Sequence, residues 1–160
     1  MLHFLPHSRK DILLRVKWLN NKRANRYAID NPEHKTTVKE QNQWFDNYEK
    51  NSDKKKFFTI FFNKIPIGFM GLSNINYKKK RADAFIFIGE DNYRNRGFGK
   101  KSMKYLINYA FKDLGICFLD LGVNKKNISA INLYRELGFV ETKDNNNEIK
   151  MILEDKVIRK

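Results

Sequence analysis

The chain has 160 residues, of which 41% are hydrophobic and 14% aromatic, and its formal net charge is +14. This length and composition suit one folded domain, taken as residues 1–160, and exclude a disordered chain. A single cysteine, Cys117, excludes an internal disulfide and a cysteine metal cluster, and the three histidines lack ligand spacing, so we expect no metal. No apolar run approaches ~20 residues and no apolar signal region begins the chain, so we expect a cytoplasmic protein with no membrane partner.

The positive charge is spread along the whole sequence. Short basic runs at 54–56 and 78–81 fall between expected elements, where charged side chains are usually solvated. The charge also admits an anionic ligand or nucleic acid, so a non-catalytic nucleic-acid-binding module is kept as an alternative. Aromatic and basic residues do not interleave on any one expected strand, so we do not expect nucleic acid as the partner.

The first half of the chain predicts helices followed by strands. Capping boxes begin at Ser8 and Thr37, and each precedes apolar residues at helical spacing. Residues 74–81 are polar and turn-like. The alternation of apolar residues predicts three consecutive strands, an antiparallel meander, at 57–62, 65–72 and 83–89.

The second half alternates helices and strands. Apolar residues at i, i+3 and i+4 across 103–114 predict an amphipathic helix, which Gly115 ends. The remaining elements are a strand at 117–123, a short helix at 130–137 and a hairpin of 139–142 with 149–153. The order β-α-α-β-β-β-α-β-α-β-β implies an α/β (α+β) fold with a mixed sheet of about seven strands flanked by about four helices.

The most informative segment is a glycine-rich basic turn, Arg94-Asn95-Arg96-Gly97-Phe98-Gly99, between a strand and a helix. Glycines let a backbone approach a ligand, and amides at a helix start point outward unpaired, so the turn suits a phosphate. A dinucleotide fingerprint fits less well because Ser102 stands where its third glycine belongs, and a Walker loop lacks its second glycine. The turn alone leaves a phosphate site and a plain helix start both open.

The pattern R-x-x-G-x-G after a strand resembles the acetyl-CoA pyrophosphate loop of the GNAT acyltransferase superfamily. A second pattern, N-x-x-A-x-x-L-Y from Asn127 to Tyr134 and then L-G-F, is similar to the other half of the GNAT site and follows roughly 30 residues later. The resemblance covers nearly the whole chain. It implies the GNAT acyl-CoA N-acyltransferase fold and an enzyme that transfers acetyl from acetyl-CoA to a primary amine without a metal.

The resemblance also implies a role for individual residues. Tyr134 would protonate the departing CoA thiolate, although its helical spacing alone places it in the core. The backbone around Phe87 would pair with pantetheine, an amide there would stabilise the oxyanion, and Gly89 permits a bulge. The residues expected to bind acetyl-CoA are Phe87, Ile88, Gly89, Arg94, Asn95, Arg96, Gly97, Phe98, Gly99, Lys100 and Asn127.

The general base is the least defined part of the site. Many relatives place a glutamate on the strand before N-x-x-A, and here that position is Gly122. Asp83, on the strand face of Phe85 and Phe87, and Glu90, just before the turn, are the candidate bases, acting directly or through water. Exposed or structural carboxylates are the other interpretation of both residues.

The N-terminal helices should shape the acceptor pocket. The segments Trp18-Leu19-Asn20 and Gln43-Trp44-Phe45 resemble a branch that includes ribosomal-protein N-terminal, aminoglycoside and aminosugar-nucleotide acetyltransferases. Basic residues on this segment and the absent glutamate favour a small amine such as an aminosugar nucleotide, with a protein N-terminus as the alternative. The basic residues concerned are Arg15, Lys17, Arg23 and Arg26. The sequence leaves a homodimer open.

Overall fold

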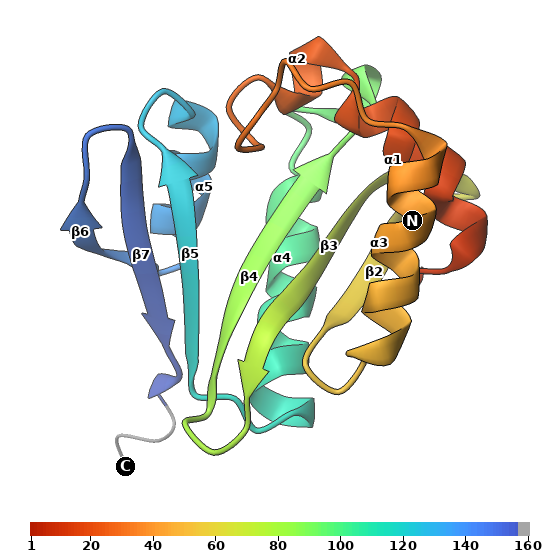
Figure 1. Ribbon diagram of the computed structural model, residues 1–160. Helices are drawn as coiled ribbons and strands as arrows, with labels where there is room; N and C mark the ends of the chain where they lie inside the picture. The colour runs from red at the N-terminus through yellow and green to blue at the C-terminus, as the bar shows by residue number, and fades with distance from the viewer. Residues whose placement is uncertain (157–160) are drawn as a thin grey trace.

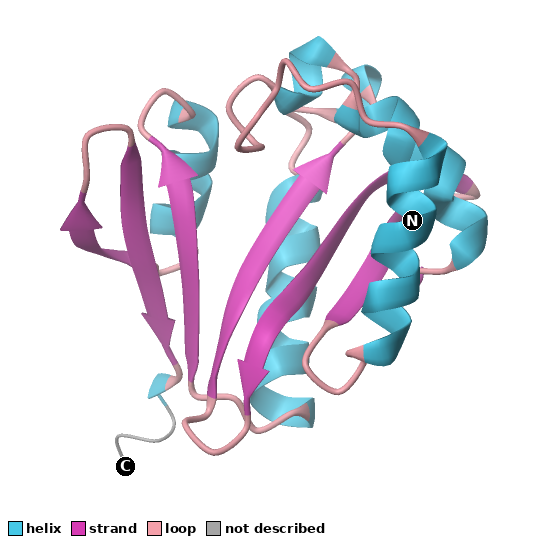
Figure 2. Ribbon diagram, in the orientation of Figure 1, coloured by secondary structure: helices cyan, strands magenta, loops and turns pink. Residues whose placement is uncertain are grey.

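The computed structural model describes residues 1–156 and contains one seven-stranded sheet with helices on both faces (Figures 1 and 2). The strand order is β1-β2-β3-β4-β5-β7-β6, and every neighbouring pair is antiparallel except β4 and β5. The predicted fold class and the β2–β3–β4 meander are confirmed. The elements are β1 (Leu2–Pro6), α1 (Ile12–Leu19), α2 (Lys22–Asn25), α3 (Val38–Lys50), β2 (Lys56–Phe62), β3 (Ile65–Asn76), β4 (Arg81–Ile88), α4 (Phe98–Asn108), β5 (Phe118–Asn124), α5 (Ile128–Glu136), β6 (Val140–Asp144) and β7 (Glu148–Glu154).

The parallel pair β4–β5 positions the site because its two strands separate. Their register covers only Arg81 with Phe118, Ala82 with Leu119 and Asp83 with Asp120. Beyond these pairs, β4 continues along β3 and β5 continues along β7. The two strands therefore diverge toward their carboxyl ends, and Figure 1 shows the resulting V-shaped split in the sheet.

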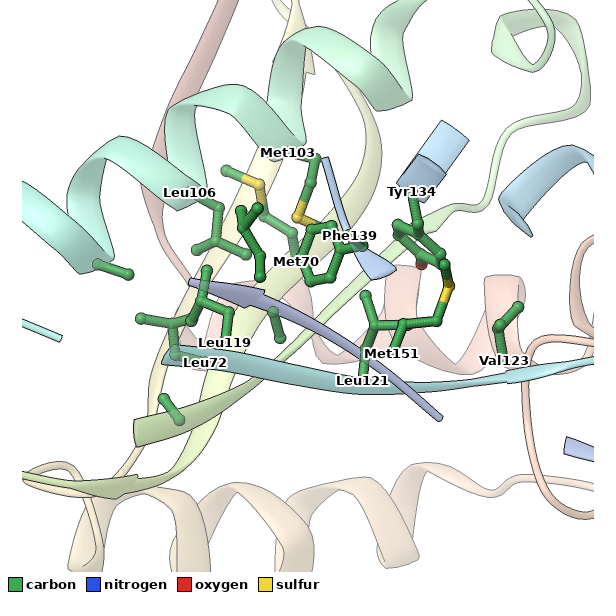
Figure 3. Close-up of a cluster of buried hydrophobic side chains, with 14 of the residues drawn as sticks. Met70, Leu72, Met103, Leu106, Leu119, Leu121, Val123, Tyr134, Phe139 and Met151 are labelled. Carbon is green, nitrogen blue, oxygen red and sulfur yellow. The ribbon is translucent and has the colours of Figure 1, made fainter. Parts of the chain in front are cut away.

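Each face of the sheet has its own apolar cluster. The face under α4 and α5 carries the larger cluster, part of which is drawn in Figure 3. The opposite face packs Phe69 and Phe87 against the fully buried Trp18 of α1. The labelled members of the larger cluster are Met70, Leu72, Met103, Leu106, Leu119, Leu121, Val123, Tyr134, Phe139 and Met151.

Both capping boxes are confirmed. The Ser8 amide donates to Asp11 Oδ2 at 2.9 Å, and the Glu40 amide donates to Thr37 Oγ1 at 3.2 Å. Side-chain acceptors at these positions satisfy amides that a helix start leaves unpaired, and so fix where α1, with its preceding 3-10 turn, and α3 begin. No helix within residues 1–156 is long and apolar enough to cross a membrane.

Two predicted elements differ from the structure. The prediction of a turn at 74–81 is wrong for its first residues, because β3 continues to Asn76. Ile75 is buried there, and its amide donates to the Lys54 carbonyl at 3.1 Å. The single helix predicted at 103–114 is α4 followed by a π-helical segment, Tyr109–Asp113. There the Leu114 amide reaches the Tyr109 carbonyl five residues back, which is the π-helical bond.

Candidate active site

A cleft of about 770 Å³ lies where β4 and β5 diverge. One wall is β4, and the other is β5 with α5. The glycine-rich turn and the start of α4 close one end, and the segment of α2 and the residues after it close the other. Residues that line it include Ala84–Ile88, Arg94, Asn95, Gly97, Gly99, Lys100, Gly122, Val123, Asn127, Ser129, Asn132, Tyr134, Arg23, Arg26 and Tyr27.

The glycine-rich turn presents backbone to the cleft. Asn95 has φ 59° and Gly97 has φ 81°, so two left-handed residues bend the chain immediately before α4 begins. Asn tolerates this conformation better than most residues, and glycine adopts it without strain. The Lys101 amide donates to the Gly97 carbonyl at 3.2 Å, the hydrogen bond with which the helical pattern of α4 starts. The amides of the preceding helical residues therefore point out of the helix end, as a phosphate site requires.

Two residues of this turn lie outside the cleft lining. The Arg96 guanidinium sits 5.1 Å from the Phe98 ring centroid and 5.9 Å from that of Phe62. Phe98 is buried, 4.7 Å from the same Phe62 ring. Their side chains therefore hold the turn against β2. The structure gives Arg96 and Phe98 a supporting role, and their predicted contact with acetyl-CoA has no support from side-chain position.

Arg94 has a different place. Its Nη1 donates to the Ile88 carbonyl at 3.2 Å, and Nη2 donates to Asp91. The side chain thus ties the turn to the end of β4 while lining the cleft. Lys100 also lines the cleft and pairs with Glu136 of α5 at 3.0 Å. Both cations lie on the wall where an anionic diphosphate would meet the helix amides.

Gly89 follows the last residue of β4, and the hydrogen bonding of the strand ends there. The amides of Gly89 and Glu90 both donate to the Ile67 carbonyl, at 2.8 and 3.1 Å. A Cβ at Gly89 would overlap the indole of Trp18, so close packing accounts for the glycine. Phe87 and Ile88 line the cleft, where the β4 edge no longer faces a strand. That edge can offer backbone hydrogen bonds to an extended ligand such as pantetheine.

Helix α5 contributes a cap and a phenol. Asn127 is the N-cap, with Oδ1 accepting from the Ala130 amide at 3.2 Å, and its NH₂ group remains available as a donor at the cleft. Tyr134 lies within the apolar cluster beside Phe139 (Figure 3), with ring centroids 5.7 Å apart. It also lines the cleft. Burial raises the pKa of Tyr134 to about 12, so its hydroxyl is a neutral proton donor at any ordinary pH.

The two predicted bases, Asp83 and Glu90, do not line the cleft with Asn127 and Tyr134. Asp83 accepts from Asn74 Nδ2 at 2.8 Å, at the closed end of the β4–β5 pair. Glu90 accepts from Lys17 at 2.7 Å and from Trp18 Nε1 at 2.8 Å. Partial burial acts to raise the pKa of Glu90, but the hydrogen bonds from Lys17 and Trp18 outweigh it and hold the pKa below its usual value. Both carboxylates lie outside the cleft lining, and their role as base stays a prediction.

The N-terminal segment supplies the remaining wall. Arg23, Arg26 and Tyr27 line the cleft, whereas the aromatic Trp18 and Phe45 are core residues. Figure 1 shows the loop that follows α2 hooking toward the end of β5. The sequence also did not single out Ser129 and Asn132 of α5 as cleft residues. Within residues 1–156, no three His, Cys, Asp or Glu side chains gather as metal ligands would.

Comparisons with known proteins agree with this geometry. The acetyltransferase (GNAT) domain family matches residues 2–140. The chain is similar to spermidine N(1)-acetyltransferase of Escherichia coli (strain K12), with 28% identity over 134 residues that cover 84% of this chain and 70% of that protein. It is also similar to acetyltransferase PseH of Campylobacter jejuni, with 29% identity over 141 residues, 86% of this chain and 82% of that protein.

Among solved structures, the fold matches spermidine N-acetyltransferase from Vibrio cholerae in complex with CoA and spermine. The TM-score is 0.84 at 22% sequence identity, and the match covers 96% of this chain and 95% of that one. At this identity, the likeness establishes a shared fold.

Proposed function

Because the chain belongs to the GNAT acetyltransferase family, its reaction is acetyl transfer from acetyl-CoA to an amine, and we propose that the acceptor is an aminosugar attached to a nucleotide. The reaction joins the amine nitrogen to the acetyl carbonyl carbon and breaks the thioester C–S bond. The protein's task is to hold both substrates in the split of the sheet, stabilise the oxyanion and supply a proton to the leaving sulfur.

The chain's own groups divide this work. The first amides of α4, with Arg94 and Lys100 beside them, bind the CoA diphosphate. The free edge of β4 and the amide of Asn127 align pantetheine, so that the thioester lies near Tyr134. An amide at the end of β4 donates to the oxyanion, and Tyr134 donates its proton to the departing thiolate. The buried, neutral phenol suits this last step.

The observation that carries the choice of acceptor is the charge of the cleft. Arg26 lies on the α2 wall, as does Arg23, whose guanidinium is 3.9 Å from the Asp91 carboxylate that Arg94 of the glycine-rich turn also contacts. Of the described residues that line the cleft, Glu136 is the single carboxylate, and Lys100 already pairs with it. Guanidinium groups bind phosphates well, whereas a polycation would meet like charge and few acceptors. The cleft therefore favours an acceptor that carries phosphate.

A second candidate is a polyamine such as spermidine. Its basis is the similarity of this chain to the spermidine N(1)-acetyltransferases of Escherichia coli and Vibrio cholerae. A protein N-terminus is the third candidate, kept from the sequence. All three are primary amines, so acetyl transfer itself does not depend on which of them is the acceptor.

The test is a CoA-release assay with UDP-glucosamine, spermidine, an aminoglycoside and short peptides as acceptors. We expect turnover on the aminosugar nucleotide, and Arg26→Ala should raise its KM about tenfold, the loss of roughly one phosphate contact. The affinity for CoA should stay unchanged. Arg9→Ala is the matched control because Arg9 pairs with Asp46 and Glu49, outside the cleft. Turnover on spermidine or peptides with none on aminosugar nucleotides would refute the proposal.

A further inference from the structure

A carboxylate from the neighbouring strand β7 lies against a residue that lines the cleft. Gly122 of β5 lines the cleft, and a Cβ at this position would collide with Oε1 of Glu148 and lie 2.8 Å from its Cδ. The carboxylate of Glu148 therefore lies directly over Gly122. It takes up the space where a side chain of residue 122 would begin.

The register of β5 and β7 explains this arrangement. Gly122 pairs with Lys150, and Asn124 pairs with Glu148. Glu148 is therefore two residues along the register from the partner of Gly122, and its side chain reaches diagonally across to Gly122. Ile149 and Met151 are buried in the cluster under α5, and successive side chains of a strand point to opposite faces. Glu148 and Lys150 consequently project from the other face, on which the α2 wall approaches the cleft.

We propose that Glu148 is the general base, which takes a proton from the acceptor's ammonium group, and that residue 122 is glycine because this carboxylate needs the space. The ammonium gives one proton to the Glu148 carboxylate and becomes a neutral amine. The amine nitrogen then bonds to the acetyl carbon, and the intermediate collapses with loss of the thiolate. Tyr134 gives its proton to the sulfur and recovers one from the nitrogen, while Glu148 returns its proton to water.

The charges around Glu148 hold it in position. Lys150 Nζ donates to Glu148 Oε1 at 2.6 Å, which fixes the carboxylate over Gly122 and leaves its other lone pairs for the amine. This bond raises the pKa of Lys150, and the more distant charges of Asp83 on β4 and Asp30 before α3 act in the same direction. Two further charged groups share the face: the Asp120–Arg81 ion pair, at 2.7 Å, and Lys143 of β6, opposite Lys150.

The inference rests on acetyl transfer to an amine and not on which amine is accepted. The first experiment measures kcat/KM against pH for Glu148→Gln with whichever of UDP-glucosamine or spermidine the wild type acetylates, and measures CoA affinity by calorimetry. We expect a roughly 100-fold loss near pH 7 that shrinks as pH rises through the pKa of the amine, because free amine then needs no base. CoA affinity should not change. Glu154→Gln is the matched control, on the same strand and face but at the closed end of β5.

The second experiment moves the carboxylate from residue 148 to residue 122. Gly122→Glu alone should lower activity, because its Cβ takes the place of Glu148 Oε1 and the Glu148 carboxylate must swing away from its position over residue 122. Adding Glu148→Ala removes that collision and restores a carboxylate at the same place, so the double variant should regain at least tenfold over Glu148→Ala alone. A loss in Glu148→Gln that is constant across pH, or a pH-dependent loss that appears in Asp83→Asn instead, would overturn the proposal. Either result leaves the acceptor assignment untouched.

Discussion

Gly99 offers the cleanest test of the diphosphate site because the fold itself does not require a glycine there. A Cβ at Gly99 would meet only Leu133 Cδ2, at an ordinary 3.8 Å. The backbone at this second position of α4 is also not among the positive-φ residues. Gly97 differs: its φ of 81° is strained for any other residue. A ligand that approaches the backbone is the remaining reason for glycine at 99.

The magnitude follows from hydrogen-bond geometry. A phosphate oxygen bound to the amides at the start of α4 lies about 2.9 Å from nitrogen, and a methyl group at Gly99 would hold it several tenths of an ångström farther away. Losing one charge-assisted hydrogen bond of about 1.5–3 kcal/mol weakens CoA binding roughly 10- to 100-fold. Gly99→Ala should nevertheless keep or slightly raise Tm, because alanine favours a helix over glycine by up to about 1 kcal/mol.

Calorimetry with CoA and thermal unfolding together decide the matter. Gly99→Ala should lose affinity without losing stability, and Gly99→Val should lose more affinity. Gly97→Ala is the contrast: it should lose affinity and also about 1–2 kcal/mol of stability from its left-handed φ. An unchanged CoA affinity in folded Gly99→Ala and Gly99→Val would refute the placement of the diphosphate at this turn.

Three further predictions concern single side chains. Tyr134→Phe should lower kcat about 100-fold with little change in CoA affinity, because the hydroxyl acts when the thiolate leaves; normal turnover would make Tyr134 a core residue alone. Because we propose Glu148 as the base, Asp83→Asn and Glu90→Gln should each keep the wild-type pH profile of kcat/KM; a changed profile in either variant would make that residue the base instead. Burial lowers the pKa of His7 to about 4, so the unfolded chain binds a proton at this residue more readily than the folded state does. The free energy of unfolding should therefore fall by up to about 3 kcal/mol as pH drops from about 6.5 to 4. His7→Asn should flatten that part of a Tm–pH curve.

Local signals in the sequence were enough to predict most of the fold. Helix caps at Ser8 and Thr37, apolar alternation and glycine stops act over a few residues, and they located α1, α3 and the three-strand meander. The split between β4 and β5 could not be predicted in this way. It depends on where the register of two strands distant in sequence ends, and no local pattern fixes that residue.

The sequence predicted the backbone of the glycine-rich turn better than the side chains of the site, because side-chain positions depend on backbone angles and strand register that local patterns do not contain. The motif predicts ligand contacts for Arg94 to Lys100. In the structure the Arg96 and Phe98 side chains lie against β2, next to the left-handed residues Asn95 and Gly97, so a contact of these two residues with the ligand stays a prediction. Side-chain direction within a turn follows from φ and ψ, which a spacing pattern does not contain. Glu148, the base that we propose, could not be singled out from the sequence because its position over Gly122 arises from the β5–β7 register, and its sequence context, a hairpin turn, resembles solvated surface.

The charge of the whole chain is a weaker guide to the acceptor than the charge of the cleft. The chain has 32 basic and 18 acidic residues, so basic residues in the lining are unremarkable for this protein; the scarcity of carboxylates carries the information. Among the described residues, the carboxylate in the lining, Glu136, is engaged by Lys100, and Glu148 beside Gly122 is engaged by Lys150. A polyamine would have to break such pairs to neutralise its second and third charges, at a cost in ion-pair energy. The proposed acceptor, with one amine and a diphosphate, needs one carboxylate for the amine, and we expect its phosphates to meet Arg26 and, in exchange for the 3.9 Å contact with Asp91, Arg23.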